Sequence, residues 1–164
     1  MVAALPALPR CVFRASTESL HPAILGRMPT HFVNAENVQH GDMPWCHVEW
    51  MSNPEIVGAQ EILLVRATFP PGQAHRFHVH PGREEIIYVL EGSAEQWVGE
   101  QKRLLKPGEM AHIPKNTPHA TYNRGTAELK FLAILSPVVA EGEFALDVFD
   151  REPWRSLDQN LRLP

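Results

Sequence analysis

A repeated pattern of short apolar runs and turn residues begins near residue 44 and continues almost to the C-terminus. Short runs rich in Val, Ile, Tyr, Phe and Trp alternate with Gly, Pro or Asn, at intervals of roughly 8–12 residues. Gly and Asn adopt a positive φ at low steric cost, so they end one run and reverse the chain. We expect strands at 44–51, 60–69, 75–80, 85–91, 94–98, 101–105, 110–114, 119–123, 128–136 and 144–149. The pattern predicts an all-β sandwich or barrel.

The rest of the chain divides into an arm and a tail around this barrel. Residues 1–40 contain scattered prolines and no sustained period of 2 or 3.6 residues, which predicts an irregular N-terminal arm. Met28 offers a second start of translation. We expect the barrel over 41–150 and a tail over 151–164, which Trp154 anchors to the barrel. A chain of 164 residues, 44% of them hydrophobic, can bury one core.

Charge and composition exclude several classes of partner. A net charge of −4 leaves no basic surplus to neutralise phosphates, so we expect no nucleic acid or membrane partner and a small-molecule ligand instead. The best apolar run, Phe131-Leu-Ala-Ile-Leu, is far shorter than the roughly 18–20 residues that cross a bilayer. Cys11 and Cys46 lack the spacing of a disulfide framework or a zinc knuckle, which favours a reducing, cytoplasmic compartment. The apolar N-terminus is a poor signal peptide, because Pro6 and Pro9 interrupt it and no basic residue precedes it.

Several expected strands are apolar at nearly every position rather than at alternate positions. The segments 85–90 and 129–135 are the clearest cases. Because successive side chains of a strand point to opposite faces, such strands are covered on both faces. A small barrel whose outer face is also covered packs against a second subunit. We therefore predict a homodimer.

Three imidazoles and one carboxylate fall in two segments of the expected barrel. His78 and His80 share one face of a strand and lie about 6.5–7 Å apart along it. If the four residues 81–84 close a hairpin, Glu85 lies directly opposite His80, with the two Cβ atoms about 4.5–5.5 Å apart. His119 opens a later strand and must reach the same point from a neighbouring position. The four side chains are thus candidates to bind a single ion.

The chemistry of these groups narrows the choice of ion. Strand parity places Glu84 in the loop or on the opposite face, so Glu85 is the expected carboxylate ligand. Imidazole and carboxylate groups favour one divalent transition metal per chain, Fe, Mn, Zn, Ni or Cu, over Ca or Mg, which prefer oxygen ligands. Four such ligands leave one or two positions free for water, O₂ or substrate. We predict a metal site made by His78, His80, Glu85 and His119.

These residues lie at spacings that resemble those of the cupin superfamily, in particular its small single-domain members. The first cupin motif, Gly-(five)-His-x-His-(three or four)-Glu-(six)-Gly, is matched at every interval by Gly72, His78, His80, Glu85 and Gly92. The second motif, Gly-(five)-Pro-x-Gly-(two)-His-(three)-Asn, is matched by Gly108, Pro114, His119 and Asn123. Asn116 replaces the usual glycine of that motif, and Asn is the best substitute for a left-handed turn residue. The resemblance covers about 60–139.

What the resemblance implies is a double-stranded β-helix, the cupin jelly-roll barrel, with the metal inside. Cupin functions range over dioxygenases, isomerases, epimerases, lyases, decarboxylases and non-enzymatic storage or sensing proteins, so the fold does not choose the chemistry. We expect first a dioxygenase that acts on a small polar or aromatic substrate. The alternatives are a non-oxidative isomerase or lyase, in which the metal acts as a Lewis acid on a sugar or sugar acid, and a small-molecule-binding protein without turnover.

Four further residues are candidates for secondary roles. Arg66 lies within an apolar strand, where it either reaches solvent at an edge or points inward as a substrate-binding residue that holds a carboxylate. His75 has the opposite parity to the two motif histidines, which favours a structural or rim position. In the non-oxidative alternative, His75 or Tyr122 is a candidate general base. His112 is expected to be a satisfied, partly buried imidazole.

Overall fold

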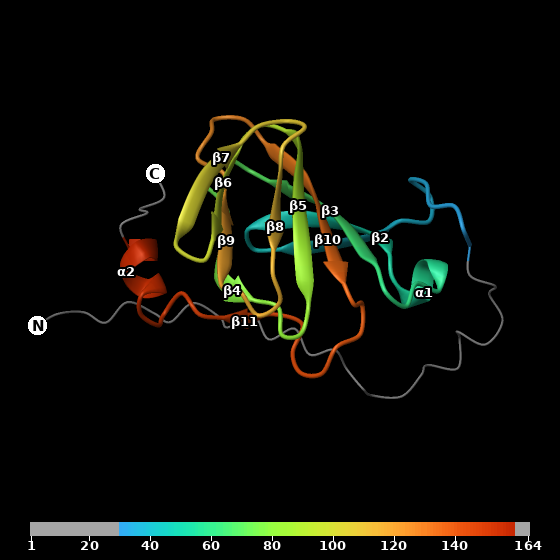
Figure 1. Ribbon diagram of the computed structural model, residues 1–164. Coiled ribbons are helices and arrows are strands. Elements are labelled where there is room, and N and C mark those ends of the chain that lie inside the picture. The colour runs from blue at the N-terminus through green and yellow to red at the C-terminus, as the bar shows by residue number, and fades with distance from the viewer. Residues whose placement is uncertain (1–29, 160–164) are drawn as a thin grey trace, which may run out of the picture.

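The computed structural model describes residues 30–159, which form two antiparallel sheets facing each other across a core (Figure 1). The larger sheet contains β1 (Gln39–Met43), β2 (Cys46–Ser52), β3 (Leu63–Phe69), β5 (Glu84–Glu91), β8 (Met110–Ile113) and β10 (Leu129–Ser136), in the order β1-β2-β3-β10-β5-β8. The smaller sheet contains β4 (Ala74–Val79), β6 (Ala94–Val98), β7 (Gln101–Leu105), β9 (His119–Tyr122) and β11 (Leu146–Asp147), in the order β11-β4-β9-β6-β7. The described residues also form two short helices, α1 (Pro54–Val57) and α2 (Trp154–Gln159). The all-β prediction is confirmed.

The core lies between the sheets because strands of the larger sheet alternate buried and partly buried side chains. On β3, Leu63, Val65, Ala67 and Phe69 are buried, and the residues between them are less so. β10 pairs with every residue of β3 and shows the same alternation. A strand with period-two burial presents one face to the core. The inward side chains of β3 and β10 also line the pocket inside the barrel.

Three elements differ from the sequence prediction. β1 extends the larger sheet from the end of the expected arm, where polar residues hide its strand character. α1 forms because the side chain of Asn53 accepts a hydrogen bond from the Ile56 N–H at 2.7 Å, with proline at the first helical position. The strand expected over 144–149 is reduced to β11.

Residues 1–29 of the arm and 160–164 of the tail lie outside the described residues. Within 30–159, neither helix has the length and apolar composition needed to cross a membrane.

The reversal at 81–84 does not close a hairpin, contrary to expectation. β4 pairs with β9 and β11, whereas β5 pairs with β10 and β8, so the chain crosses here from one sheet to the other. The N–H of Gly82 donates to Oδ1 of Asn116 at 2.9 Å, which joins this crossing to the loop before β9. Asn116 has a φ of 60°, the left-handed conformation that the usual motif glycine would supply. This hydrogen bond links the two segments that carry the motif residues.

The C-terminal helix covers the outer face of the smaller sheet. The ring of Trp154 lies 5.1 Å from that of Phe77 on β4, which confirms that this tryptophan packs on the barrel. The hydroxyl of Tyr122 donates to the Asp158 carboxylate at 2.7 Å. The Arg76 guanidinium binds the same carboxylate, with its Nε 3.0 Å from Oδ2. Apolar packing and a buried polar cluster therefore both hold the tail on the barrel.

Candidate metal centre

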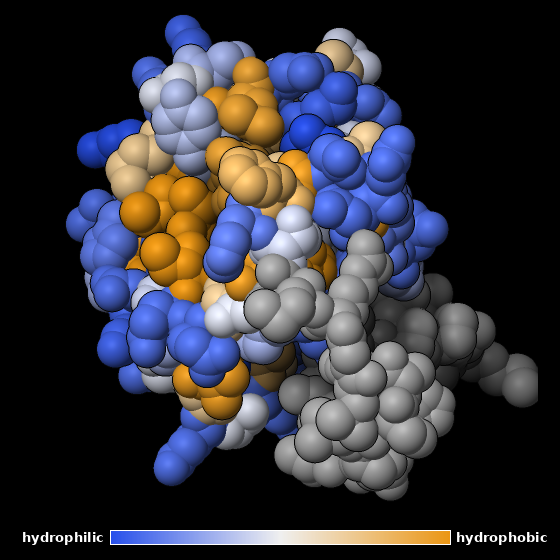
Figure 2. Space-filling view, turned by 90° about the vertical axis from the view of Figure 1, so that its right-hand side faces the viewer, coloured by the Kyte–Doolittle hydropathy of each residue, from blue (hydrophilic) through white to orange (hydrophobic). Residues whose placement is uncertain are grey.

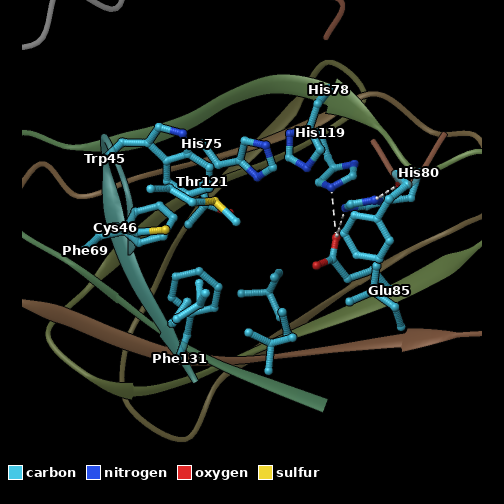
Figure 3. Close-up of a pocket in the computed structure, with 18 of the residues that line it drawn as sticks. Trp45, Cys46, Phe69, His75, His78, His80, Glu85, His119, Thr121 and Phe131 are labelled. Carbon is cyan, nitrogen blue, oxygen red and sulfur yellow. Dashed lines mark hydrogen bonds and ion pairs between the residues drawn. The ribbon is translucent and has the colours of Figure 1, made fainter. Parts of the chain in front are cut away.

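The three motif histidines and the motif glutamate meet inside the barrel. Each of His78, His80, Glu85 and His119 offers one ligand atom, and these atoms all lie within 4.8 Å of one another. None of the four residues is more than 5% exposed. Figure 3 shows them gathered at one end of a pocket. The arrangement can hold one metal ion.

Strand pairing and the crossing between sheets bring these side chains together. His78 on β4 and His119 on β9 are directly paired, with ring centroids 4.1 Å apart. His80 follows the end of β4 and stays close to both. Glu85 reaches across from the larger sheet, and its Oε2 lies 2.8 Å from Nε2 of His119 and 3.7 Å from Nε2 of His80. Glu84 is exposed and contacts His112 at 3.0 Å, as its parity predicts.

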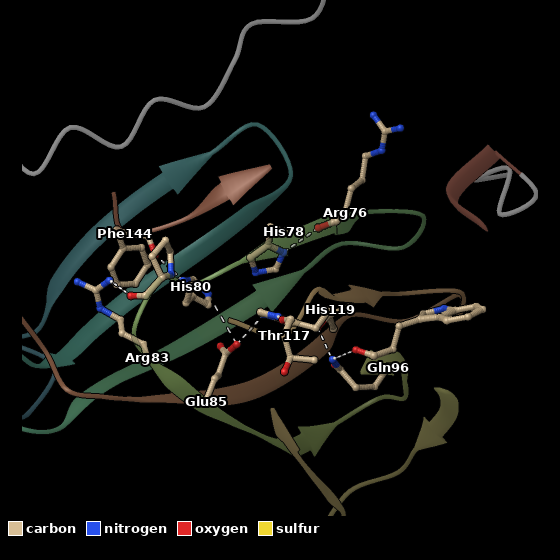
Figure 4. Close-up of polar contacts among 12 residues, drawn as sticks. Arg76, His78, His80, Arg83, Glu85, Gln96, Thr117, His119 and Phe144 are labelled. Atoms are coloured by element: carbon tan, nitrogen blue, oxygen red, sulfur yellow. Dashed lines mark hydrogen bonds and ion pairs between the residues drawn. The ribbon is translucent and has the colours of Figure 1, made fainter. Parts of the chain in front are cut away.

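Backbone carbonyls hold all three imidazoles in one tautomer (Figure 4). Nδ1 of His78 donates to the Arg76 carbonyl at 2.7 Å, and Nδ1 of His80 donates to that of Phe144 at 2.7 Å. Nδ1 of His119 donates to the Thr117 carbonyl at 2.9 Å. Because a carbonyl oxygen can only accept, each ring carries its proton on Nδ1 and keeps a lone pair on Nε2. Such hydrogen bonds orient metal-binding histidines and raise their basicity.

The protonation states also suit a metal ion. Burial lowers the pKa of His78 well below its ordinary value, and neighbouring imidazoles add to the effect. Burial likewise lowers the pKa of His80, although the nearby Glu85 opposes this. Burial alone raises the pKa of the Glu85 carboxyl, but the adjacent His119 and His80 outweigh it and bring that pKa below its ordinary value. His78 and His80 are therefore neutral and Glu85 is ionised near pH 7, which are the metal-binding forms.

Two of the ligand atoms have no other partner. Oε2 of Glu85 and Nε2 of His119 are buried, and neither makes a hydrogen bond to any described residue. Nε2 of His119 and Oε2 of Glu85 lie 2.8 Å apart, but the contact does not have the geometry of a hydrogen bond. An unsatisfied buried polar atom costs about 1–3 kcal/mol. Two such acceptors beside the Nε2 atoms of His78 and His80 fit one shared cation.

The rest of the pocket is almost entirely apolar. Its walls come from inward residues of β2, β3 and β10, from the β1–β2 turn and from the connection that leads to β11. Apart from the four candidate ligands, the strongly polar side chains in the lining are His75 and Thr121, and no Lys or Arg is among them. The hydroxyl of Thr121 donates to Gln96 at 2.7 Å. The aromatic lining residues are Trp45, Trp50, Phe69, Phe131 and Phe144.

His75 lines this pocket, contrary to its strand parity. Relative to β9, β4 carries an extra residue, because His75 pairs with Thr121 while His78 pairs with His119. This β-bulge turns His75 to the pocket side, and bulges often re-aim side chains beside active sites. Its ring stacks on His78 with centroids 3.4 Å apart and on Trp45 at 4.4 Å. The rim or structural position expected from period-two counting is therefore corrected to a place in the pocket wall.

Arg66 does not line the pocket. It lies on the outer face of β3, between the buried Val65 and Ala67. Its guanidinium donates two hydrogen bonds to the Glu49 carboxylate on β2, with Nη2 2.6 Å from Oε1. The inward orientation that would hold a substrate carboxylate is thus not observed, because Glu49 on the neighbouring strand is the arginine's partner. Period-two counting from the buried valine would have placed this charge outside.

The other polar candidates also lie away from the pocket. Tyr122 is fully buried, and its hydroxyl donates to Asp158 of α2. Burial and this contact raise the pKa of Tyr122 above its ordinary value. It is therefore not a base for this site. The side chain of His112 is 51% exposed rather than partly buried, and it pairs with Glu84 on the outer surface. His112 thus plays no part in the site.

Sequence reasoning missed Phe144, which closes one side of the site. Its carbonyl accepts the His80 hydrogen bond, and its ring lies 5.0 Å from that imidazole. The buried guanidinium of Arg83 lies 5.2 Å from the same ring and donates to the carbonyls of Pro81, Val138 and Glu143. No local pattern marks this connection, since its role depends on contacts far away in sequence.

Comparison with known proteins identifies the family. Residues 65–135 match the family model of the cupin domain. An uncharacterized protein of Methanocaldococcus jannaschii is 34% identical over 85 residues, which are 52% of this chain and 68% of that protein. The tetracenomycin polyketide synthase protein TcmJ of Streptomyces glaucescens is 28% identical over 100 residues, 61% of this chain and 66% of that protein. The structure of the polyketide cyclase RemF from Streptomyces resistomycificus has a TM-score of 0.62 and 22% identity, over 79% of this chain and 93% of RemF.

The chain therefore belongs to the cupin superfamily, and its two sheets form the double-stranded β-helix of that family. The resemblance read from the two motifs is confirmed. The buried His/His/Glu/His cluster is a site that can bind a metal ion.

Proposed function

We propose that this cupin is a mononuclear metal enzyme of dioxygenase type that acts on a small, largely apolar molecule in its barrel. His78, His80, Glu85 and His119 hold the ion. When bound, a divalent transition metal supplies open positions at which substrate and O₂ can be brought together. The observation that supports the proposal most directly is the placement of four buried ligand groups at one end of an aromatic pocket.

The role of the chain itself is to keep this site ready. The three carbonyl partners hold each imidazole in its metal-binding tautomer, so no ring has to rotate or lose a proton before it binds. The carboxylate of Glu85 cancels one charge of a divalent ion. One negative charge on a substrate oxygen is then enough to neutralise the centre, which favours an enolate or phenolate over a dianion.

The pocket walls support a substrate with a flat carbon skeleton. Aromatic side chains line the cavity, and they exclude water and offer faces on which a ring can stack. Two of the relatives carry names that concern polyketides, TcmJ and RemF. A polyketide bears carbonyl or enol oxygens on a carbon skeleton with little charge, and such a molecule matches an apolar pocket with a metal at one end.

A non-oxidative reaction on the same kind of substrate is the second candidate. RemF is a polyketide cyclase, and His75 stands in the pocket wall where a substrate proton would be within reach of an imidazole. The sugar and sugar-acid version of this alternative is less favoured, because the lining lacks cationic side chains and has few hydrogen-bonding groups. The remaining alternative is a small-molecule-binding protein, for which we expect ligand binding but no conversion of any substrate.

A second copy of this chain is the expected partner of the larger sheet. Apolar side chains follow one another across its outer face, where Leu132 is paired with Tyr88 and Ile134 with Ile86. Tyr88 is 37% exposed. Figure 2 views the molecule from the side on which β10, β3 and β2 lie in Figure 1, and shows hydrophobic residues gathered there. Burial of such a patch favours dimerisation.

Sedimentation analysis at micromolar concentration tests the dimer. A dimer that dissociates in Leu132→Glu, but persists in the matched Leu104→Glu on β7, supports the proposal. Leu104 is 57% exposed and lies on the other sheet. A monomeric wild type would contradict it.

Metal reconstitution under nitrogen tests the reaction. Metal-free protein is loaded with Fe(II), Mn(II) or Zn(II), and O₂ uptake is followed with a panel of cyclic enols and diphenols. Substrate-dependent uptake with iron or manganese, and none with zinc, supports the dioxygenase. Conversion of substrate without O₂, equally in the zinc form, selects the non-oxidative candidate. Failure of the protein to bind any of the three metals contradicts both.

A further inference from the structure

Apart from the four candidate metal ligands, His75 is the strongly polar pocket residue whose ring nitrogens make no hydrogen bond to another described residue. The three histidines among the candidate ligands donate through Nδ1 to carbonyls, and the Thr121 hydroxyl donates to Gln96. Within residues 30–159, the ring of His75 makes contacts by stacking alone. A neutral imidazole has one donor and one acceptor nitrogen, so it can pair with either a hydroxyl or a carbonyl.

The two stacking contacts fix how this ring is presented. Trp45 lies against it with an interplanar angle of 19°, and His78 lies against it with an angle of 18°. Its faces are thus occupied, and a ligand can meet only its edge, where the nitrogens are. In Figure 3, Trp45, His75 and His78 follow one another along one wall of the pocket. The edge of His75 therefore stands beside the candidate metal site, held in plane before any ligand arrives.

The charges around the pocket limit what this edge can recognise. Arg66 pairs with Glu49 on the outer face, and Arg76 pairs with Asp158 of α2. Arg83 donates to carbonyls behind Phe144. No cationic side chain lines the pocket, so a second carboxylate or a phosphate on the ligand would have no counter-charge there. Burying such a group unpaired is costly.

We propose that His75 is the ligand-recognition residue of this pocket, and that its ring edge hydrogen bonds one oxygen of a flat enol or phenol carrying at most one negative charge. A second oxygen of the same ligand occupies the metal. This inference rests on the proposed metal site and narrows its substrate class. It predicts that ring compounds with neighbouring oxygens bind more tightly than small dicarboxylates, sugar acids and phosphates.

Binding of two probes to the cobalt-loaded protein tests the inference. Cobalt(II) gives visible bands that report the metal site, and 4-nitrocatechol is a flat, coloured diphenol; oxalate is the dicarboxylate probe. The variant His75→Phe keeps a ring that can stack but removes both nitrogens, and His75→Gln restores a hydrogen-bonding group. The matched control is His112→Phe, the same change at an exposed site on β8.

The wild type is expected to bind 4-nitrocatechol at least tenfold more tightly than oxalate. His75→Phe should weaken 4-nitrocatechol binding by roughly tenfold, the fold-change that loss of one hydrogen bond produces. Its cobalt affinity and visible bands should stay unchanged, His75→Gln should recover part of the loss, and His112→Phe should behave as wild type. Equal affinity of wild type and His75→Phe, or tighter binding of oxalate, would overturn the inference while leaving the metal site intact. A wild type that takes up no cobalt would instead overturn the proposed function, and this inference with it.

Discussion

His78 on β4 and His119 on β9 are directly paired across the smaller sheet, with their ring centroids 4.1 Å apart. The two residues belong to different motifs, and the register between β4 and β9 places them opposite each other. Nearby contacts support this pairing. His80 directly follows β4, and the hydrogen bond between Gly82 and Asn116 joins the loop after β4 to the loop before β9. The site is therefore a property of sheet pairing rather than of any single loop.

Glu85→Gln should lose the metal while Glu84→Gln keeps it. The amide is nearly isosteric but neutral, so it cannot supply the buried negative charge that faces three imidazoles. Removal of an outer hydrogen-bond partner already costs about 10–100-fold in metal affinity, and loss of a direct ligand should cost at least that much. Competition titration with a chelator measures the affinities. Equal metal affinity in the two variants would contradict the assigned carboxylate.

The metal-free protein should lose stability as the pH falls below about 6.5. Burial lowers the pKa values of His75, His78 and His80 from an ordinary value of 6.5, so the unfolded chain binds their protons more readily than the folded one. Their neutral forms thus contribute stability above pH 6.5, and it is lost on acidification by up to about 1.4 kcal/mol per pH unit for each histidine. Urea unfolding between pH 5 and pH 8 measures this, and His75→Phe should reduce the slope. A free energy of unfolding that does not change over this range would refute the prediction.

Asp158→Asn should destabilise the barrel without changing metal affinity. The carboxylate is 8% exposed and receives hydrogen bonds from Tyr122 and Arg76. Weakening these charge-assisted bonds should cost about 1–3 kcal/mol, which is several degrees in melting temperature for a chain of this size. Glu152→Gln is the control, because its pair with Arg155 is on the surface. If the two variants have the same melting temperature, the buried cluster around Asp158 does not hold the tail on the barrel.

Arg66→Ala should leave ligand binding unchanged and cost at most about 1 kcal/mol of stability. The guanidinium faces outward, and its pair with Glu49 is partly open to solvent, where ion pairs contribute little. Probe affinity in the cobalt-loaded protein and the free energy of unfolding measure the two effects. A loss of probe affinity in the folded variant would show that this arginine reaches the pocket after all.

Much of the fold was predictable because strand periods and turn residues act locally. The positions of β3, β5, β6, β7, β9 and β10 follow from apolar runs bounded by Gly, Pro or Asn. β1 was hidden because its residues are polar, and its pairing with β2 depends on a neighbour that the sequence does not display. The predicted pairing of β5 with the strand before it is wrong for a similar reason. A short hairpin turn and a short crossing between sheets have similar sequences, and only the strand pairing distinguishes them.

The site was predictable in part because motif spacing constrains which side chains share a face. Period-two counting separated Glu85 from Glu84, and it failed at His75 because a single bulged residue inverts parity. The contacts of Phe144 depend on a connection whose course is set by the buried Arg83 and by loop carbonyls. Such features arise from tertiary packing, which a local pattern does not encode.

Anomalous diffraction from a crystal of untagged, metal-loaded protein tests whether these four residues bind one ion. Data recorded on both sides of the absorption edge of the bound metal identify the element and locate it. We expect one peak per chain, at the point shared by Nε2 of His78, His80 and His119 and by the Glu85 carboxylate. No peak at this point, or a peak elsewhere in the barrel with these four side chains turned away from it, would show that they do not form the metal site.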